Sequence, residues 1–269
     1  MNIHRKFVLG ALAAAVAAAA VSVASGAVTP PPSIKSAGKI VYCTDATYPP
    51  EESYQGSKII GSDIDIGTEI AKRMGVKAQF DNTGFDGIIA ALLAKKCDAV
   101  ISGMNDTAER RKAVDFVDYI RVGQSRMVQK GNPKHITSLA SLSGKTVSVE
   151  TGTTNRDFLI AESKKLKAAG KKPITIKTFP KDTDAAAALK TGRVDAYFGD
   201  TPVVAYYIAR DPSFGFGVSP IAPIPVGIAI RKGDPLKAAT QAAVNAMYAD
   251  GTMKRILAKW KMSDAALKK

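Results

Sequence analysis

The amino-acid sequence predicts an α/β protein made of two similar, doubly wound lobes that are joined by two hinge strands. A motif that appears twice supports this fold class: an alanine-rich helix, a tight turn and a short strand opening with Asp-Ala occupy 90–103 and again 186–200. A second echo lies upstream of each copy, where apolar strands run into polar residues at 39–45 and 145–151. Because ligands of such folds lie beyond the carboxyl ends of the strands, we expect a ligand between the loops of the two lobes.

The N-terminus has the features of a bacterial secretory signal peptide. A positive leader at 4–6 precedes an apolar, alanine-rich run at 7–23, and small residues suited to cleavage follow. We therefore predict a signal peptide at 1–27 that is cleaved near residue 24 or 27, and an exported protein. No later segment approaches the ~20 apolar residues of a transmembrane helix, so we expect no membrane insertion after cleavage.

Hydrophobic spacing gives the order of elements in each lobe. After a proline-rich, flexible lead-in at 28–37, the first lobe is expected to contain a strand at 40–44, a helix at 63–74, a strand at 76–80, a helix at 85–93 and a strand at 99–102. The second lobe repeats this order, with a strand at 146–149, a helix at 155–169, a strand at 174–178, a helix at 183–190 and a strand at 196–198.

Two apolar, extended-looking segments at 119–130 and 216–230 are expected to cross between the lobes, and the chain then returns to the first lobe with helices at 236–249 and 252–260. Two crossing strands make a hinge. The predicted boundaries are 38–121 and 226–269 for lobe 1, 122–225 for lobe 2, and hinge segments near 119–126 and 218–226.

The net charge and the cysteines say less about the function than the repeated motif and the signal peptide do. The chain of 269 residues carries a net charge of +14, and cleavage of the signal removes Arg5 and Lys6 and leaves +12. The lysines lie on predicted helix faces such as 162–167 without interleaved aromatic residues, which favours solvated faces over a nucleic-acid groove. Cys43 lies near the end of its strand and Cys97 before the start of another, so strand rise should keep them apart, and we expect two unbridged thiols.

Charged and polar residues beyond the strand ends suggest a clamp for a zwitterion. Arg110 follows the 99–102 strand, and a guanidinium can bind a carboxylate through two parallel hydrogen bonds. Thr153 and Thr154 open a helix whose free amides suit an anion, although an ordinary N-cap explains them as well. Asp200 would match an ammonium group, and its competing interpretation is an N-cap of the helix that opens at Thr201. A surface arginine remains the alternative for Arg110.

Several short motifs, taken together, resemble the family 3 extracellular solute-binding proteins, the amino-acid receptors of bacterial ABC importers. The resemblance covers nearly all of the mature chain. It rests on Thr44-Asp45-Ala46-Thr47-Tyr48-Pro49-Pro50, Gly61-Ser62-Asp63-Ile64-Asp65, Ser102-Gly103-Met104 with Glu109-Arg110, Gly152-Thr153-Thr154, Gly192-Arg193-Val194-Asp195-Ala196 with Asp200, and Asp250-Gly251-Thr252.

The resemblance implies two Rossmann-like lobes of the periplasmic binding protein type 2 fold and a periplasmic monomer that delivers a free amino acid to an inner-membrane ABC permease. It assigns the ligand's carboxylate to Arg110 and its ammonium to Asp200, and it sandwiches the ligand's side chain between Tyr48 and Phe85. The full set of implied ligand-binding residues is Asp45, Tyr48, Phe85, Ser102, Gly103, Asn105, Arg110, Glu150, Thr153, Thr154 and Asp200. No cofactor, metal or nucleic acid is implied.

Carboxylates at the far end of the side-chain pocket favour arginine, lysine, ornithine or histidine, with glutamine or another polar amino acid next. Glu150 stands where an apolar residue is common in relatives that take basic ligands, and would add a carboxylate. Glu51, Asn105 and Asp106 also depart from the family's usual residues, which leaves the choice of side chain open.

Two other functions remain. Periplasmic cyclohexadienyl or arogenate dehydratases share the fold of the family and use a cleft carboxylate as general acid, a role that Glu150 or Glu51 could fill. His135 has no metal-spaced partners, and serine-nucleophile and phosphate-loop motifs are absent from the sequence. Because the Asp200 clamp fits a free amino acid better than prephenate, which has no ammonium group, we expect a binding protein and not an enzyme. A ligand sensor that docks a membrane receptor is the third possibility.

Overall fold

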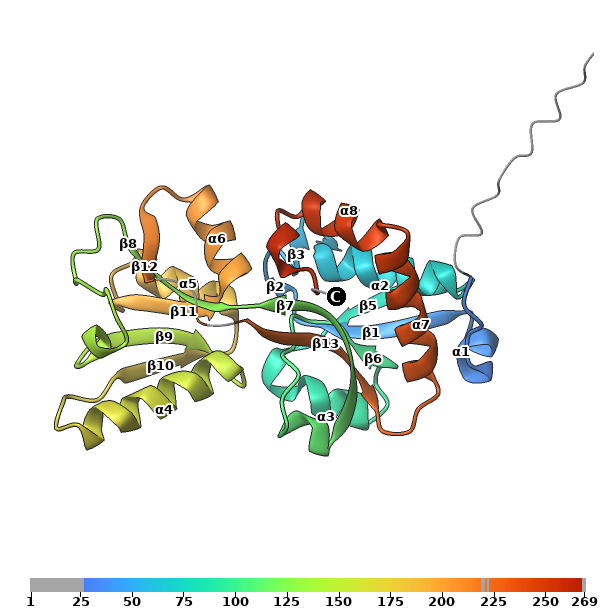
Figure 1. Ribbon diagram of the computed structural model, residues 1–269, viewed down its shortest axis with the longest axis horizontal. Helices are drawn as coiled ribbons and strands as arrows, with labels where there is room; N and C mark the ends of the chain where they lie inside the picture. Colours follow the sequence, from blue (N-terminus) through green and yellow to red (C-terminus); the bar gives the residue numbers. More distant parts are fainter. Residues whose placement is uncertain (1–26, 219–220, 222, 268–269) are drawn as a thin grey trace, which may run out of the picture.

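Two lobes lie side by side, each built on a five-stranded sheet with helices on both faces (Figure 1). The computed structural model describes residues 27–218, 221 and 223–267, so the predicted signal peptide lies outside the described residues apart from its last position. The chain passes from one lobe to the other at Gly123, and it is back in the first lobe at Ile224; of the predicted second hinge at 218–226, residues 219, 220 and 222 lie outside the described residues. This arrangement confirms the predicted α/β class with two lobes and two connecting segments.

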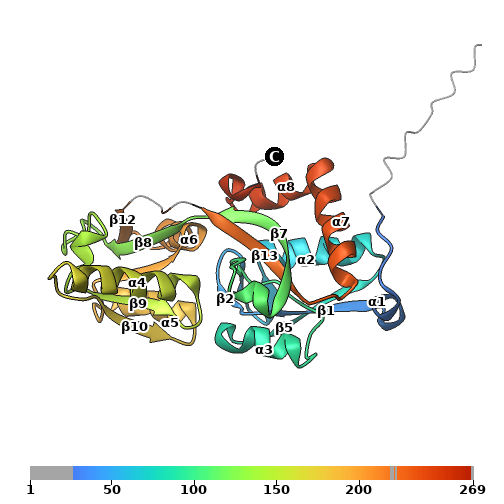
Figure 2. The same cartoon turned by 60° about the horizontal axis from the view of Figure 1, so that its bottom comes forward.

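The first lobe holds the sheet order β5-β1-β6-β13-β7. Strand β1 pairs in parallel with β5 and with the central strand β6, and β13 runs antiparallel to β6 and β7. Figure 2 shows β7 and β13 running together toward the second lobe. The strands span Lys39–Thr44 (β1), Lys77–Asn82 (β5), Ala99–Val100 (β6), Val114–Val122 (β7) and Ile224–Arg231 (β13).

Successive side chains of a strand point to opposite faces of its sheet, and β1 shows how the lobe fills both. Ile40 and Tyr42 pack in the cluster that includes α2, α7 and α8, whereas Cys43 packs with α3 on the other face. The helices span Ser62–Arg73 (α2), Ile88–Leu93 (α3), Leu236–Ala249 (α7) and Thr252–Lys259 (α8), with short 3-10 turns at Phe85–Gly87 (η1), Arg110–Lys112 (η2) and Ser263–Ala265 (η4).

The second lobe repeats the pattern in the order β10-β9-β11-β8-β12, with β9 parallel to β10 and to the central strand β11. In β11, Tyr197 packs with α5 and α6 while Phe198 packs with α4 on the opposite face. The elements are Gln124–Gln129 (β8), Ala140–Leu142 (η3), Thr146–Glu150 (β9), Thr154–Ala168 (α4), Thr175–Phe179 (β10), Asp182–Lys190 (α5), Ala196–Asp200 (β11), Thr201–Arg210 (α6) and Phe214–Val218 (β12).

A small three-stranded sheet of lobe 1 was not expected from the sequence. It consists of β2 (Thr47–Tyr48), β3 (Glu52–Gln55) and β4 (Lys58–Ile60), joined as antiparallel neighbours. The sheet carries Tyr48 toward the second lobe, where this ring joins the apolar cluster of α5 and α6.

The predicted flexible lead-in is wrong for its last residues, because Pro32–Ala37 forms helix α1. Pro32 takes the first helical position, which needs no amide hydrogen, and Gly38 ends the helix at a φ of 65°. Ile34 is only 5% exposed and packs in the core of lobe 1. Burial of the Ile34 side chain therefore anchors this proline-rich segment to lobe 1.

The expectation of two unbridged thiols is also wrong, because Cys43 and Cys97 form a disulfide. Their Cα atoms lie 5.7 Å apart, within the usual range for a bridge. The prediction assumed that the chain before β6 is extended, so that the rise along the strand separates the two cysteines. Instead, Lys95 has a φ of 59° and a turn over 94–98 brings Cys97 back beside β1. Asp98 then donates its amide hydrogen to the Val41 carbonyl at 2.7 Å.

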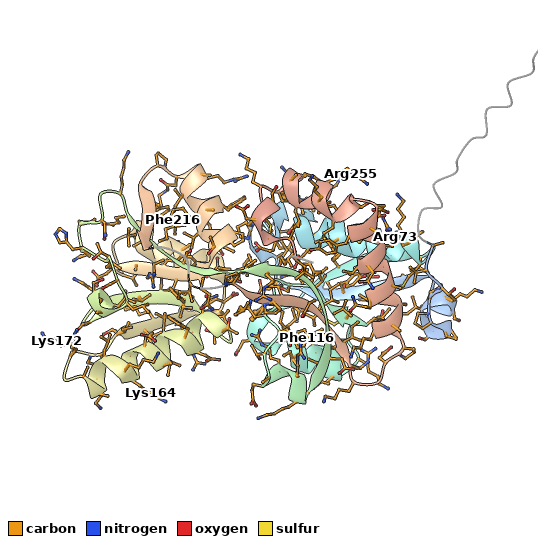
Figure 3. The ribbon with its side chains drawn as sticks, in the orientation of Figure 1. Arg73, Phe116, Lys164, Lys172, Phe216 and Arg255 are labelled. Atoms are coloured by element: carbon orange, nitrogen blue, oxygen red, sulfur yellow. A yellow bond between two sulfur atoms is a disulfide. The ribbon has the colours of Figure 1, made fainter. Side chains whose placement is uncertain are left out.

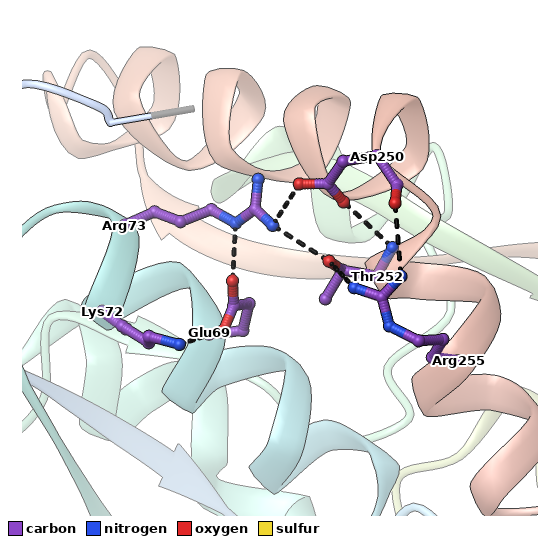
Figure 4. Close-up of polar contacts among 6 residues, drawn as sticks. All are labelled: Glu69, Lys72, Arg73, Asp250, Thr252 and Arg255. Carbon is purple, nitrogen blue, oxygen red and sulfur yellow. Dashed lines mark hydrogen bonds and ion pairs between the residues drawn. The ribbon is translucent and has the colours of Figure 1, made fainter. Parts of the chain in front are cut away.

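The C-terminal helices are fixed to α2 by the buried Arg73 side chain (Figure 4). Its guanidinium bonds Glu69 at 2.8 Å, Asp250 at 2.7 Å and Thr252 at 3.1 Å. The Asp250-Gly251-Thr252 motif therefore ties the returning chain to lobe 1.

Lys164 and Lys172 point outward at the edge of lobe 2 (Figure 3). Within the described ranges, no helix is long and apolar enough to cross a membrane.

Candidate functional site

The carboxyl ends of the parallel strands in both sheets face a small cavity of about 10 Å³ between the lobes. This is where open α/β sheets hold their ligands, because the loops that follow the strands converge there. Lobe 1 lines the cavity with Tyr48, Phe85, Gly103 and Asn105, and lobe 2 lines it with Glu150, Thr153, Thr154, Asn155 and Asp200.

Asp45 and Ser102, two of the predicted site residues, lie behind the lobe 1 wall and hold it in place. Asp45 accepts a hydrogen bond from the Thr47 hydroxyl at 2.7 Å and another from the Phe85 amide at 2.7 Å, one on each carboxylate oxygen. The Ser102 hydroxyl accepts from the Asp45 amide at 2.9 Å and donates to Glu52 at 2.7 Å. These bonds position the loops that carry Tyr48, Phe85 and Gly103.

Arg110 reaches across the boundary between the lobes at the margin of the cavity. Its guanidinium donates to the Asn105 carbonyl at 2.8 Å and to the Gly152 carbonyl of lobe 2 at 3.0 Å. It also lies 5.4 Å from the centre of the Phe85 ring, within cation–π distance. The alternative of a free surface arginine does not fit these contacts. The neighbouring Arg111 is exposed and instead binds Asp106.

Thr153 and Thr154, at the start of α4, have different tasks. The Thr153 hydroxyl donates to the Glu150 carbonyl at 2.9 Å and accepts from the Arg156 amide at 3.2 Å, so Thr153 is the N-cap of α4. The Thr154 hydroxyl instead donates across the cavity to Asn105 Oδ1 at 2.5 Å. Both residues line the cavity, but only the Thr154 hydroxyl donates a hydrogen bond to the opposite lobe.

Asp200 stands at the N-cap position of α6, yet its side chain makes no capping hydrogen bond. Its Oδ1 accepts from Asn155 Nδ2 at 3.1 Å, and its backbone amide donates to the Tyr48 hydroxyl at 3.2 Å. The competing N-cap role is therefore not the one its carboxylate fills. Asn155 was missing from the predicted site. Its position next to Thr153-Thr154 at a helix start was the available signal.

Three side chains of the cavity wall each contain a buried polar atom without a hydrogen-bond partner: Asn105 Nδ2, Glu150 Oε1 and Asn155 Oδ1. A buried polar atom without a partner costs free energy, about 1–3 kcal/mol in mutational data. One donor and two acceptors are thus available inside a single cavity.

Burial between the lobes shifts the acids of the site toward their neutral forms. It raises the pKa of Asp200 to about 7, against the hydrogen bonds from Asn155 and Tyr48 and the charge of Arg110. Burial also raises the pKa of Glu150 well above its usual range, and Asp182, Asp45 and Asp200 add to the shift. Burial lowers the pKa of Arg110, which remains a cation because a guanidinium does not lose its proton in proteins. The site is rich in acid groups and has one fixed cation at its margin.

Glu51, Asn105 and Asp106 differ from the residues that are usual in the family. Asn105 lines the cavity, and Glu51 and Asp106 lie beside it. Glu51 is buried, has one oxygen without a partner, and has its pKa raised by burial and by the nearby Asp63 and Asp200. Asp106 is occupied by Arg111. In the described part of the chain, no group of three or more His, Cys, Asp or Glu side chains is arranged to hold a metal ion.

Comparison with known proteins gives consistent matches along the chain. The family model of bacterial extracellular solute-binding proteins, family 3, matches residues 40–263. The ABC transporter arginine-binding protein 1 of Escherichia coli K12 is 32% identical over 232 residues, which cover 84% of this chain and 91% of that protein.

Two solved structures of ancestral proteins have the same fold. An ancestral arginine-binding protein bound to arginine has a TM-score of 0.76 and 40% identity, covering 83% of this chain and 98% of that one. The ancestral amino-acid-binding protein AncCDT-1, a precursor of cyclohexadienyl dehydratase, has a TM-score of 0.77 and 36% identity, covering 85% of this chain and 97% of that one.

Proposed function

Because this chain belongs to the bacterial extracellular solute-binding proteins of family 3, we propose that it captures a polar or basic L-amino acid between its lobes in the periplasm. The lobes close on the ligand, and the closed form delivers it to an inner-membrane ABC permease. The arginine-binding relatives support an amino acid as the ligand.

The observation that carries the proposal is the convergence of Asn105 Nδ2, Glu150 Oε1 and Asn155 Oδ1 on one cavity. An amino acid supplies both an acceptor, its carboxylate, and donors, its ammonium and polar side chain. The ligand would therefore provide the partners that these three buried atoms lack.

Arg110 and Asp200 fit the two charged groups of the ligand. A ligand carboxylate is a stronger partner for the Arg110 guanidinium than the Gly152 carbonyl, because charge-assisted hydrogen bonds are roughly twice as strong as neutral ones. Asp200 is near enough for Arg110 to lower its pKa, so both charges belong to one small site. An ammonium beside Asp200 would favour its ionised form.

The side chain of the ligand would lie between the rings of Tyr48 and Phe85, which both line the cavity. Arginine, lysine, ornithine or histidine fits best, because apolar ring faces suit the stem of a long side chain and buried carboxyls suit its cationic end. Glutamine is the next candidate.

Calorimetric titration of the mature protein with the twenty amino acids, ornithine and citrulline tests the proposal. We expect one group of related amino acids to bind. Arg110→Ala and Asp200→Asn should each weaken the binding at least about tenfold, since hydrogen bonds to charged groups contribute about 1.5–3 kcal/mol. Arg111→Ala removes the neighbouring exposed arginine and should leave the affinity unchanged. Absence of binding by every amino acid, or full affinity in both site variants, would refute the proposal.

A dehydratase activity is the second candidate, because Glu150 is a buried acid in the cavity and AncCDT-1 is a dehydratase precursor. The binding proteins among the relatives favour capture over catalysis. Ultraviolet detection of phenylpyruvate or phenylalanine after addition of prephenate or arogenate separates the two functions. Turnover that is lost in Glu150→Gln would support the enzyme.

A further inference from the structure

Glu150 lines the cavity and has an oxygen without a partner, whereas Glu51 and Glu52, which also have one each, do not line it. Both oxygens of Asp45 are occupied by Thr47 and Phe85, and both oxygens of Asp182 are occupied by Tyr197 at 2.5 Å and Tyr207 at 3.1 Å. Glu150 Oε1 accepts no hydrogen bond among the described residues, although the side chain lines the cavity and the residue is only 2% exposed. Glu150 is therefore a carboxyl of the cavity lining with a buried oxygen left for a ligand side chain.

The backbone keeps Glu150 in this place. Glu150 is the last residue of β9 and pairs with Phe179 of β10, and its carbonyl accepts from the Thr153 hydroxyl that caps α4. The following residue, Thr151, donates its amide hydrogen to the Phe179 carbonyl at 2.9 Å. A strand end fixed on both sides cannot carry the carboxyl out to solvent without breaking the edge of the lobe.

The groups that face Glu150 are mostly acidic. Asp182 of α5, Asp45 behind the lobe 1 wall and Asp200 at the end of β11 raise its pKa together with burial, and Tyr207 of α6 lies near enough to interact with it. Lys181 lowers the pKa of Asp45 and Arg110 lowers that of Asp200, whereas neither is among the main causes of the pKa shift of Glu150. Burial among these acids favours the neutral form of Glu150.

We propose that Glu150 selects the side chain of the ligand by exchanging its proton for a cationic group. In the exchange, the O–H bond of the Glu150 acid breaks, the proton goes to solvent, and the carboxylate pairs with the ligand's guanidinium or ammonium end. A neutral ligand of the same shape leaves the acid protonated and receives at most a neutral hydrogen bond. This inference rests on the proposed amino-acid binding and adds that the side-chain choice is linked to proton release.

Arginine and citrulline separate the two cases because their side chains have nearly the same shape and differ in charge. Calorimetric titration of the mature protein in phosphate and in Tris at pH 7 gives the number of protons released for each ligand. Asp200 meets the same ammonium group in both ligands, so its contribution cancels. We expect arginine to release up to one proton more than citrulline, and its affinity to rise from pH 5 to pH 8 relative to that of citrulline.

Glu150→Gln should abolish the extra proton and weaken arginine binding at least about tenfold, the loss of one charge-assisted contact, while citrulline binding changes little. Glu162→Gln is the matched control, because Glu162 is a buried acid of the same lobe that pairs with Lys165 on α4 away from the cavity. The wild-type measurement needs no variant, so it decides the matter even if Glu150→Gln fails to fold.

Equal proton release by arginine and citrulline, or an unchanged preference for arginine in a folded Glu150→Gln protein, would overturn the role of Glu150 and leave amino-acid capture intact. If no amino acid binds the wild-type protein, capture itself is refuted and the inference fails with it.

Discussion

Asp182 is a buried carboxyl of lobe 2 whose two oxygens accept hydrogen bonds from Tyr197 and Tyr207. Burial raises its pKa to about 7, and the nearby Asp200 and Asp45 add to the effect of burial. Its amide also donates to the Thr47 hydroxyl of lobe 1 at 3.2 Å. A single residue thus links the core of lobe 2 to the buried Thr47 of lobe 1.

The raised pKa of Asp182 predicts that the folded protein loses stability as the pH rises from about 4 to about 7. The folded state holds the proton to a higher pH than the unfolded chain does, so the contribution is fully present at low pH and disappears as the pH passes the folded pKa. One pKa unit corresponds to about 1.4 kcal/mol, so the full effect is of the order of 4 kcal/mol.

Asp182→Asn keeps the shape of the side chain and removes its titration. Thermal unfolding of the ligand-free protein between pH 4 and pH 8 should show a smaller decline in Tm for this variant than for the wild type. Asp157→Asn, at an exposed position of α4, should leave the decline unchanged. A wild-type decline in the Asp182→Asn protein would show that this acid is not the source.

The disulfide between Cys43 and Cys97 joins β1 to the turn before β6 on the α3 face of lobe 1. It closes a segment with a sequence separation of 54 residues, which contains α2, β5 and α3. In the chain-entropy model, a loop of this size stabilises the folded state by about 4 kcal/mol.

Reduction of the bridge, or replacement of both cysteines by serine, is therefore expected to lower the Tm by roughly 8–16 °C, at about 2–4 °C per kcal/mol. Calorimetric unfolding with and without reductant checks this. The double-serine variant should not respond to reductant. An oxidised and a reduced wild-type protein with the same Tm would contradict the assigned role of the bridge.

The sequence predicted the long elements well because their periodicity is strong. The helices at α2, α4, α5, α7 and α8 and the central strands lie within a few residues of their expected bounds. It missed β2 to β4 and α1, which are short and depend on contacts made elsewhere in the chain, such as the burial of Ile34. The prediction that Cys43 and Cys97 are unbridged was wrong because a turn, and not extended chain, precedes β6.

The sequence predicted which strand ends form the candidate site, but it predicted less well which side chains face the cavity. Tyr48, Phe85, Glu150, Thr154 and Asp200 line the cavity. Positions beyond the strand ends indicated Thr154 and Asp200, and the family resemblance indicated Tyr48, Phe85 and Glu150. Asp45 and Ser102 are turned into the wall by hydrogen bonds with partners about forty to sixty residues away, at Phe85 and Glu52 and between each other. No local pattern specifies such contacts.

At the scale of the whole molecule, the two lobes meet through a few specific contacts around the cavity. Hydrogen bonds between described residues of the two lobes join Arg110 to the Gly152 carbonyl, Thr154 to Asn105, the Asp200 amide to Tyr48, and the Asp182 amide to Thr47. Tyr48 also packs its ring into the lobe 2 cluster. The closed arrangement thus depends on close approach at a small number of positions.

Gly152 is one of these positions, because a Cβ there would lie 2.9 Å from Asp86 Oδ1 and 3.0 Å from Asp86 Cα in the opposite lobe. Gly152→Ala should hinder closure and weaken amino-acid affinity about tenfold, a cost of about 1.4 kcal/mol. Calorimetry gives the affinity, and small-angle scattering gives the change in radius of gyration on ligand addition.

Gly170→Ala is the control for backbone strain. Gly170 has a φ of 71°, close to the 79° of Gly152, but a Cβ there meets nothing within 4 Å. Both variants should lose a similar amount of stability, and only Gly152→Ala should lose affinity and compaction. Equal affinity in the two variants would mean that closure at Gly152 does not limit binding.

A crystal structure of the mature protein, grown with the amino acid that binds most tightly in the calorimetric panel, tests the central claim most directly. The account predicts the amino acid in the cavity between the lobes, with its carboxylate on Arg110, its ammonium on Asp200 and its side chain between Tyr48 and Phe85, ending at Glu150. An amino acid bound elsewhere, or bound in the cavity without contact to Arg110 and Asp200, would contradict it.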